Sequence, residues 1–296
     1  MRIAVVGLGG VGGYLAACLS RSSHDVVGFA RSNHLEVIKK NGIEIIEDIN
    51  SSELKKWQKD LDARELSQAD GYFDIVLFCV KSYDLKESYE KIRAFIDTKT
   101  ILLSFSNGVN NGDILRELSS SIVLDGCIYI LSHIQENGVI RKTGKVFNAV
   151  FGGEENSANI IKHIFESVDL RVKTPENIKT AIYKKFIFIS AFASLTTYFN
   201  ESIVQVCENH PLEAKTVLDE IANVAFAQGI DILDEVDKSL KVAKSLPYES
   251  STSMHLDYKN SKKMELESLC GYVVKEGEKN LVDTPFMSMI YKELSK

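Results

Sequence analysis

Glycines with the spacing G-x-G-x-x-G stand within the first thirteen residues of the chain. Gly7, Gly9 and Gly12 follow the apolar run Ile3–Val6 and precede a segment of small residues, so the pattern predicts strand, tight turn and helix. The first glycine permits the turn, the second lets backbone amides approach a diphosphate, and the third lets the helix lie close to the strand. The positive end of the helix dipole favours the same anion. The expected dinucleotide-binding residues are Gly7, Leu8, Gly9, Gly10, Val11 and Gly12.

A positive side chain stands where such chains select their dinucleotide. The run Asp25–Arg31 predicts a second strand, and its last residue lies 19 residues beyond Gly12. Chains that bind NAD present Asp or Glu at this place, whereas Arg31 can pair with a 2′-phosphate and stack on adenine. The expected cofactor is therefore NADP(H). A solvated arginine at a strand end is the alternative interpretation.

Two further polar residues follow apolar runs typical of parallel strands that are covered on both faces. Lys81 comes directly after Asp74–Val80, and Asn107 comes shortly after Thr100–Phe105. Ligands of doubly wound sheets lie outside the carboxyl ends of the strands, so Arg31, Lys81 and Asn107 are expected to face one ligand. Each residue by itself would also fit ordinary turn chemistry.

Strands and helices alternate in the first half of the chain, and they are the elements that must position these residues. The alternation predicts an α/β fold with a Rossmann-type doubly wound sheet. Within residues 122–151 the pattern changes to antiparallel pairs, with hairpin turns expected at 136–138 and 142–144.

Helical patterns dominate from residue 176 onward. The segment 178–199 is apolar on every side, as is typical of a buried helix, and a later helix is expected from about 253 to 277. The sequence thus predicts a dinucleotide-binding domain at residues 1–175, followed by an all-helical substrate and catalytic domain at residues 176–296.

The composition is that of an ordinary globular protein, with 45% hydrophobic and 26% charged residues. A net charge of −6 gives no indication of a nucleic-acid partner. Five scattered cysteines favour buried thiols in a reducing compartment, and the six histidines lack metal-ligand spacing, so no metal is expected. Because the apolar segment 186–195 is too short to span a bilayer and the chain begins with a strand, we expect a cytoplasmic protein without a membrane partner.

Taken in order, these pieces resemble the ketopantoate reductase family, the NADPH-dependent 2-dehydropantoate 2-reductases. The resemblance also rests on Tyr183–Phe186, Thr252–Met254 and Lys263–Glu267, and it covers nearly the whole chain. It implies a doubly wound N-terminal domain, an all-helical C-terminal domain and, often, a homodimer. The implied reaction is reduction of a 2-oxo acid, first of all ketopantoate to pantoate in pantothenate biosynthesis.

The resemblance also assigns roles to single residues. Lys185 matches the catalytic lysine of the family. Ser253 and Glu265 match its substrate-binding serine and acid, and Glu265 could also orient the lysine. Lys81 and Asn107 would lie along the nicotinamide, with Asn107 also contacting the substrate.

Elementary chemistry supports a lysine in such a site. Hydride addition to a ketone builds negative charge on oxygen, so the site needs a cation or proton donor at that atom. Lys185, near the start of an apolar helix that is expected to be buried, would supply both the cation and the proton. Burial would lower the pKa of Lys185 toward neutrality. Without the family resemblance, a snorkelling lysine and a solvated glutamate at 265 would be the simpler interpretations.

The chain departs from the family pattern where substrate is expected to bind. The family's asparagines four and eight residues after the lysine are Ile189 and Ala193 here. The adjacent Ser190 and Ser194 are rotated by about 100° on a helix, so they are not simple substitutes. The usual threonine before the late glutamate is Met264. Three hypotheses stay open: a ketopantoate reductase, a reductase of a more apolar 2-oxo acid, and a catalytically inactive NADPH-binding redox sensor.

Overall fold

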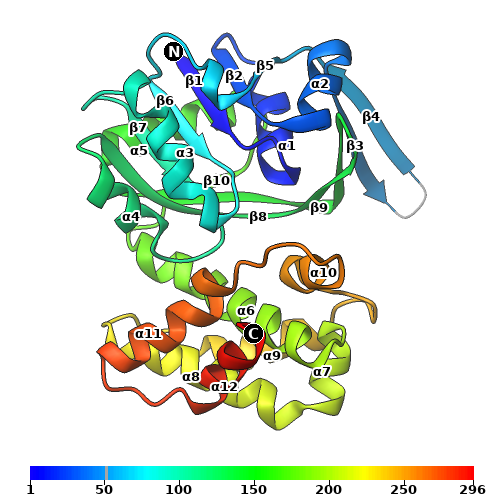
Figure 1. The fold of residues 1–296 in the computed structure, drawn as a ribbon, viewed down its shortest axis with the longest axis vertical. Coiled ribbons are helices and arrows are strands. Elements are labelled where there is room, and N and C mark those ends of the chain that lie inside the picture. Colours follow the sequence, from blue (N-terminus) through cyan, green and yellow to red (C-terminus); the bar gives the residue numbers. More distant parts are fainter. Residues whose placement is uncertain (51–52) are drawn as a thin grey trace. The chain divides into compact units, whose positions relative to one another are not determined.

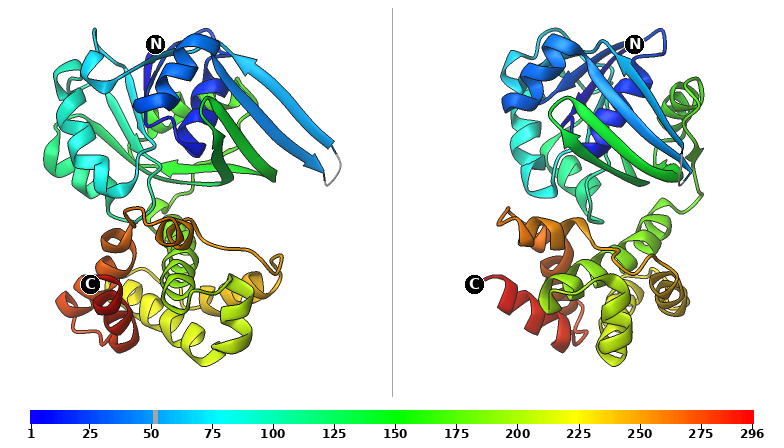
Figure 2. Two further views of the ribbon diagram at one scale, coloured as in Figure 1. Left: turned by 45° about the vertical axis from the view of Figure 1, so that its right-hand side comes forward. Right: turned by 90° about the vertical axis from the view of Figure 1, so that its right-hand side faces the viewer.

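The computed structural model describes residues 1–50 and 53–296. The chain forms two compact units, each with its own apolar core (Figures 1 and 2). The first unit contains residues 1–106 and 110–178, and the second contains residues 107–109 and 179–296.

A ten-stranded mixed sheet organises the first unit (Figure 1). Its strands are β1 (Arg2–Val6), β2 (Asp25–Phe29), β3 (Ile43–Asn50), β4 (Glu53–Lys59), β5 (Asp62–Arg64), β6 (Ile75–Phe78), β7 (Ile101–Ser104), β8 (Ile122–Glu136), β9 (Val139–Gly152) and β10 (Val172–Lys173). The order β5-β2-β1-β6-β7-β8 is parallel throughout, which is the strand order of doubly wound dinucleotide-binding sheets. The Rossmann-type sheet predicted from the sequence is confirmed.

Helices cover both faces of this sheet. They are α1 (Gly10–Leu19), α2 (Ser32–Asn41), α3 (Leu85–Ile92), α4 (Asn111–Leu118) and α5 (Glu155–Glu166), with 3-10 turns η1 (Leu66–Gln68), η2 (Ser82–Asp84) and η3 (Arg93–Phe95). Successive side chains of β1 point to opposite faces, so Val5 joins a core with α1 and α5 while Val6 joins one with α3 and α4. Burial on both faces explains why these strands are continuously apolar.

The antiparallel part of the sheet differs from the sequence prediction. β8 and β9 form one long hairpin with a turn at residues 137–138, whereas the second predicted turn, at 142–144, is wrong. β9 continues through this segment as one strand, and residues 143–146 bulge out opposite Leu131. Pairing with β8 on both sides of the bulge therefore overrides the local turn signal.

The second unit is entirely helical (Figure 1). It consists of α6 (Ile178–Phe199, which begins one residue before the unit), α7 (Ile203–Asn209), α8 (Pro211–Ala227), α9 (Glu235–Lys244), α10 (Ser253–Lys259), the π-helical turn η4 (Glu267–Gly271), α11 (Tyr272–Lys279) and α12 (Pro285–Leu294). Buried side chains along α6 pack into the core that the other helices surround, as expected for a helix that is apolar on every side.

The single helix predicted from about 253 to 277 is wrong, because the chain leaves the helix after Lys259. Ser261 adopts a left-handed φ of 51°, and the Lys262 amide donates to the Asp257 carbonyl at 2.8 Å, which closes the helix end. The irregular segment that follows carries Glu265. Helix returns with η4 and α11.

Within residues 1–50 and 53–296, none of the helices combines the length and apolarity that a membrane span requires. All five cysteines are free thiols.

Candidate functional site

The glycine loop between β1 and α1 is held by defined backbone bonds. Gly7 has a φ of 96°, a conformation that favours glycine, and its amide donates to the Phe29 carbonyl at 2.9 Å. The Leu8 amide donates to the same carbonyl at 3.2 Å. The first amides of α1 have no partner within the helix by the geometry of an α-helix, so they are available to an anion.

Each glycine of the loop has a different local environment. A Cβ on Gly12 would lie 1.9 Å from the Gly7 carbonyl oxygen, and one on Gly10 would lie 2.4 Å from the Ser132 carbonyl oxygen of β8. A Cβ on Gly9 would meet nothing within 4 Å. Gly10 and Gly12 are therefore required by packing, whereas Gly9 borders open space. A diphosphate fits this arrangement because it needs open space beside the first amides of a helix.

Arg31 lies beyond the strand to which the sequence assigned it. β2 ends at Phe29, because its partner β5 ends at Arg64, whose carbonyl accepts the last pairing bond from Ala30. Arg31 is the N-cap residue of α2, still on the carboxyl side of the sheet. Its side chain is 82% exposed and pairs with Asp84 at 3.1 Å. The guanidinium is thus accessible to an anionic ligand.

The segments after β6 and β7 are tied together at the carboxyl edge of the sheet. The Ser106 hydroxyl donates to the Val80 carbonyl at 2.6 Å, and the Asn111 amide donates to the Ser106 carbonyl at 3.0 Å. Lys81, directly after Val80, is half-buried at the start of η2. These bonds fix the chain on both sides of the turn that carries Asn107.

Three of the predicted residues form a polar row in the helical unit. Nζ of Lys185 donates to Oδ1 of Asn107 at 3.3 Å, and Nδ2 of Asn107 donates to Oε2 of Glu265 at 3.4 Å. Glu265 is 3% exposed, and Lys185 is half-buried near the start of α6. An ammonium and a carboxylate are thus joined through one amide. Such a row can deliver a proton and hold a polar substrate group.

Other charged or polar residues near the row in the sequence, or predicted to act with it, do not belong to it. Lys184 pairs with Glu235 at 3.4 Å. Glu267 is exposed, and its hydrogen bond from Lys275 holds the pKa of its carboxyl below the usual range. Ser253, at the start of α10, is exposed, and the structure does not join it to the polar row.

Apolar side chains occupy the α6 positions where the family has asparagines. Ile189 is partly buried and Ala193 is 2% exposed. Ser190 and Ser194 point toward the π-helical turn instead: Ser190 donates to the Leu269 carbonyl at 3.4 Å, and Ser194 lies 2.8 Å from the Cys270 thiol. Both hydroxyls therefore have hydrogen-bond partners inside the helical unit.

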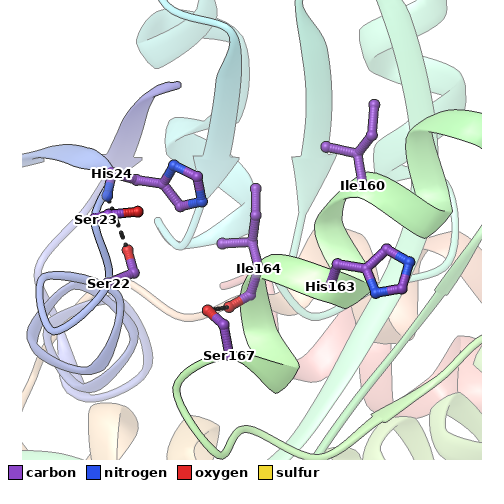
Figure 3. Close-up of a pocket in the computed structure, with 7 residues that line it drawn as sticks. All are labelled: Ser22, Ser23, His24, Ile160, His163, Ile164 and Ser167. Carbon is purple, nitrogen blue, oxygen red and sulfur yellow. Dashed lines mark hydrogen bonds between the residues drawn. The ribbon is translucent and has the colours of Figure 1, made fainter.

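A hollow of about 500 Å³ lies elsewhere on the first unit (Figure 3). It is lined by Ser22, Ser23, His24, Ile160, His163, Ile164 and Ser167. These residues flank the amino end of β2 and the end of α5. The hollow therefore lies at the amino ends of the parallel strands, whereas the glycine loop lies at their carboxyl ends. The Ser22 and Ser167 hydroxyls donate to backbone carbonyls at 2.7 Å. Among the residues that the structure describes, no group of three or more His, Cys, Asp or Glu could hold a metal ion.

Two residues near the predicted cofactor site were not found from the sequence. Asp84, the partner of Arg31, lies 53 positions further along the chain. His34 is a single histidine on α2 with no motif around it, yet it contacts the glycine loop. Neither the type of these two residues nor their spacing in the sequence identified them as candidate site residues.

Comparisons with known proteins agree on one family. The model described as "Ketopantoate reductase PanE/ApbA" matches residues 3–153, and its C-terminal counterpart matches residues 177–296. An uncharacterized oxidoreductase, YkpB, of Bacillus subtilis is 27% identical, covering 99% of this chain and 98% of its own. A 2-dehydropantoate 2-reductase of Archaeoglobus fulgidus is 26% identical, covering 95% of this chain and 92% of its own.

Solved structures show the same likeness. A PanE/ApbA family ketopantoate reductase from Ralstonia eutropha has a TM-score of 0.91 and 26% identity, covering 100% of this chain and 97% of its own. D-Mandelate dehydrogenase with NADH and anilino(oxo)acetate has a TM-score of 0.88, covering 99% of this chain and 96% of its own. At 20% identity, the latter similarity shows the fold alone.

Proposed function

Because this chain belongs to the ketopantoate reductase family, we propose that it catalyses the NADPH-dependent reduction of a 2-oxo acid, with ketopantoate as the first candidate substrate. The observation that carries the proposal is the row of Lys185, Asn107 and Glu265. In this proposal residues 1–175 bind the dinucleotide, and residues 176–296 bind the substrate and supply the proton donor.

The polar row has a distinct task at each position. NADPH, when bound, supplies the hydride that the substrate carbon receives. Lys185 gives a proton to the carbonyl oxygen, where negative charge develops. Asn107 holds the ammonium through its oxygen, and its amide nitrogen holds Glu265. Glu265 accepts a hydrogen bond from a polar group of the substrate, and Ser253 is proposed as a further substrate contact.

Features of the first unit support NADP(H) as the cofactor. Gly9 borders open space at the start of α1, as a diphosphate site requires. Arg31 offers an exposed guanidinium, which can bind a 2′-phosphate through paired hydrogen bonds. Lys81 at the carboxyl end of β6 is proposed to lie on the nicotinamide side. NADH in D-mandelate dehydrogenase supports a nicotinamide cofactor of this general kind.

A more apolar 2-oxo acid is the second candidate substrate. Ile189 and Ala193 stand where the family carries asparagines, and Val109 and Met264 also pack against the apolar core of the helical unit. A site without these amides loses hydrogen bonds to a substrate hydroxyl, which lowers its preference for ketopantoate. The aromatic 2-oxo compound bound to D-mandelate dehydrogenase is of this apolar type.

Steady-state turnover with NADPH and a series of 2-oxo acids tests the proposal. In Lys185→Ala, we expect turnover to fall by about 10²–10⁴-fold while NADPH affinity stays within about twofold, because the proton donor is lost and the glycine loop is intact. Lys184→Ala is the matched control: Lys184 lies beside Lys185 on α6 but pairs with Glu235 of α9, so this variant should keep its turnover.

Equal turnover in Lys185→Ala and the wild type would contradict the role of Lys185. Tight NADPH binding with no turnover on any acid would favour the redox-sensor hypothesis. The ranking of the acids by kcat/KM decides between ketopantoate and an apolar substrate.

A further inference from the structure

The buried histidine on α2 connects the glycine loop to a distant hairpin. Nε2 of His34 lies 2.9 Å from the Leu8 carbonyl oxygen, and the Gly138 amide lies 3.0 Å from Nδ1. Resting on the proposed function, we propose that His34 is a positioning residue for the cofactor. It holds the Leu8 carbonyl so that the Gly9 amide stays turned toward the diphosphate.

The two bonds require one tautomer of the imidazole. A carbonyl oxygen can only accept, so Nε2 of His34 must carry the hydrogen and donate to Leu8. The Gly138 amide can only donate, so Nδ1 must be unprotonated. His34 is 9% exposed, and burial lowers its pKa, which agrees with a neutral ring.

The planarity of the peptide bond links the Leu8 carbonyl to the Gly9 amide. The carbonyl of Leu8 and the N–H of Gly9 belong to one peptide plane and point in opposite directions. Holding the carbonyl against His34 therefore aims the Gly9 N–H away from α2. The other side of the loop is already fixed, because the Gly7 and Leu8 amides both donate to the Phe29 carbonyl.

The hairpin turn that His34 contacts depends less on the imidazole than the Leu8 carbonyl does. The Gly138 carbonyl accepts from the Glu44 amide at 2.9 Å, and Val37 lies against the same glycine. The turn between β8 and β9 thus keeps two further contacts without His34. The Leu8 carbonyl has His34 as its hydrogen-bond donor.

Two substitutions separate the bonds, because each amide side chain reproduces one ring nitrogen. His34→Gln places an N–H near the position of Nε2 and keeps the bond to Leu8. His34→Asn places an acceptor near the position of Nδ1 and keeps the bond from Gly138. We expect the Kd for NADPH, measured by isothermal titration calorimetry, to stay within about threefold in His34→Gln and to rise about tenfold in His34→Asn. His163→Asn, an exposed histidine on α5, is the control.

The outcomes distinguish this inference from the proposed function. If the wild type does not bind NADPH, the proposed function fails and the inference fails with it. If the wild type binds NADPH but His34→Asn binds as tightly as His34→Gln, the inference alone fails, because a purely structural role at the hairpin would favour His34→Asn. A second measurement uses the wild type only, so it does not depend on how the variants fold. ¹⁵N NMR should show the Nε2–H tautomer of His34 and a shift of Nε2 on NADPH addition, whereas an Nδ1–H tautomer or no shift would overturn the inference.

Discussion

Replacing single glycines of the loop by alanine tests whether open space or packing explains each of them. We expect Gly9→Ala to weaken NADPH binding with little effect on folding, and Gly12→Ala to lower the free energy of unfolding. The two positions lie in one loop and receive the same methyl group, so each variant is the control for the other.

The expected magnitudes follow from the surroundings of each glycine. Gly9 has a φ of −69°, which alanine adopts without strain, and its Cβ would meet nothing within 4 Å. Alanine is a less favourable N-cap than glycine, which lowers the stability, but it also makes the unfolded chain less flexible, which raises it. The free energy of unfolding of Gly9→Ala should therefore differ from the wild type by less than about 1 kcal/mol. The methyl group would occupy the space of the diphosphate. Loss of one charge-assisted amide bond, about 1.5–3 kcal/mol, weakens binding about 10- to 100-fold.

Gly12 is different because a Cβ there would lie 1.9 Å from the Gly7 carbonyl oxygen and 2.8 Å from Cβ of Cys79. Backbone must move to relieve this overlap, at a cost of about 1–3 kcal/mol. Urea unfolding measures the stability, and isothermal titration calorimetry measures the NADPH affinity. Wild-type affinity in Gly9→Ala would refute the placement of the diphosphate, and wild-type stability in Gly12→Ala would refute the packing explanation.

Three further predictions concern the cofactor, the thiols and the pH dependence of stability. Arg31→Ala should weaken NADPH binding by about 10- to 100-fold and leave NADH binding unchanged, as measured by titration calorimetry. The free energy of unfolding should change by less than about 0.5 kcal/mol, because the ion pair of Arg31 is exposed. A wild-type protein that prefers NADH would contradict this role of Arg31. Burial raises the pKa of the Cys270 thiol to about 12, so a colorimetric thiol reagent at pH 8 should leave this buried thiol unmodified until urea is added. Burial also lowers the pKa of His34 and His255, so below about pH 6.5 the unfolded chain binds more protons and the free energy of unfolding should fall; a urea midpoint that rises on acidification would oppose this.

Local patterns allowed much of the fold to be predicted. The bounds of α6, residues 178–199, follow from apolarity on every side of one helix, which is a property of that segment alone. The strands β1, β6 and β7 were visible as apolar runs for the same reason. The break after Lys259 was missed because no proline or glycine stands there, and it depends on a left-handed serine.

The sequence by itself determined the glycine loop, the doubly wound sheet and the types of residue suited to reduction, because these depend on neighbours within one or two elements. Only the tertiary structure decided that Asn107 joins Lys185 to Glu265, which are 78 and 158 positions away from it. It likewise decided that residues 142–144 continue a strand and that His34 contacts the loop. These outcomes depend on contacts between distant segments, and no periodicity or spacing along the chain encodes which distant groups will meet.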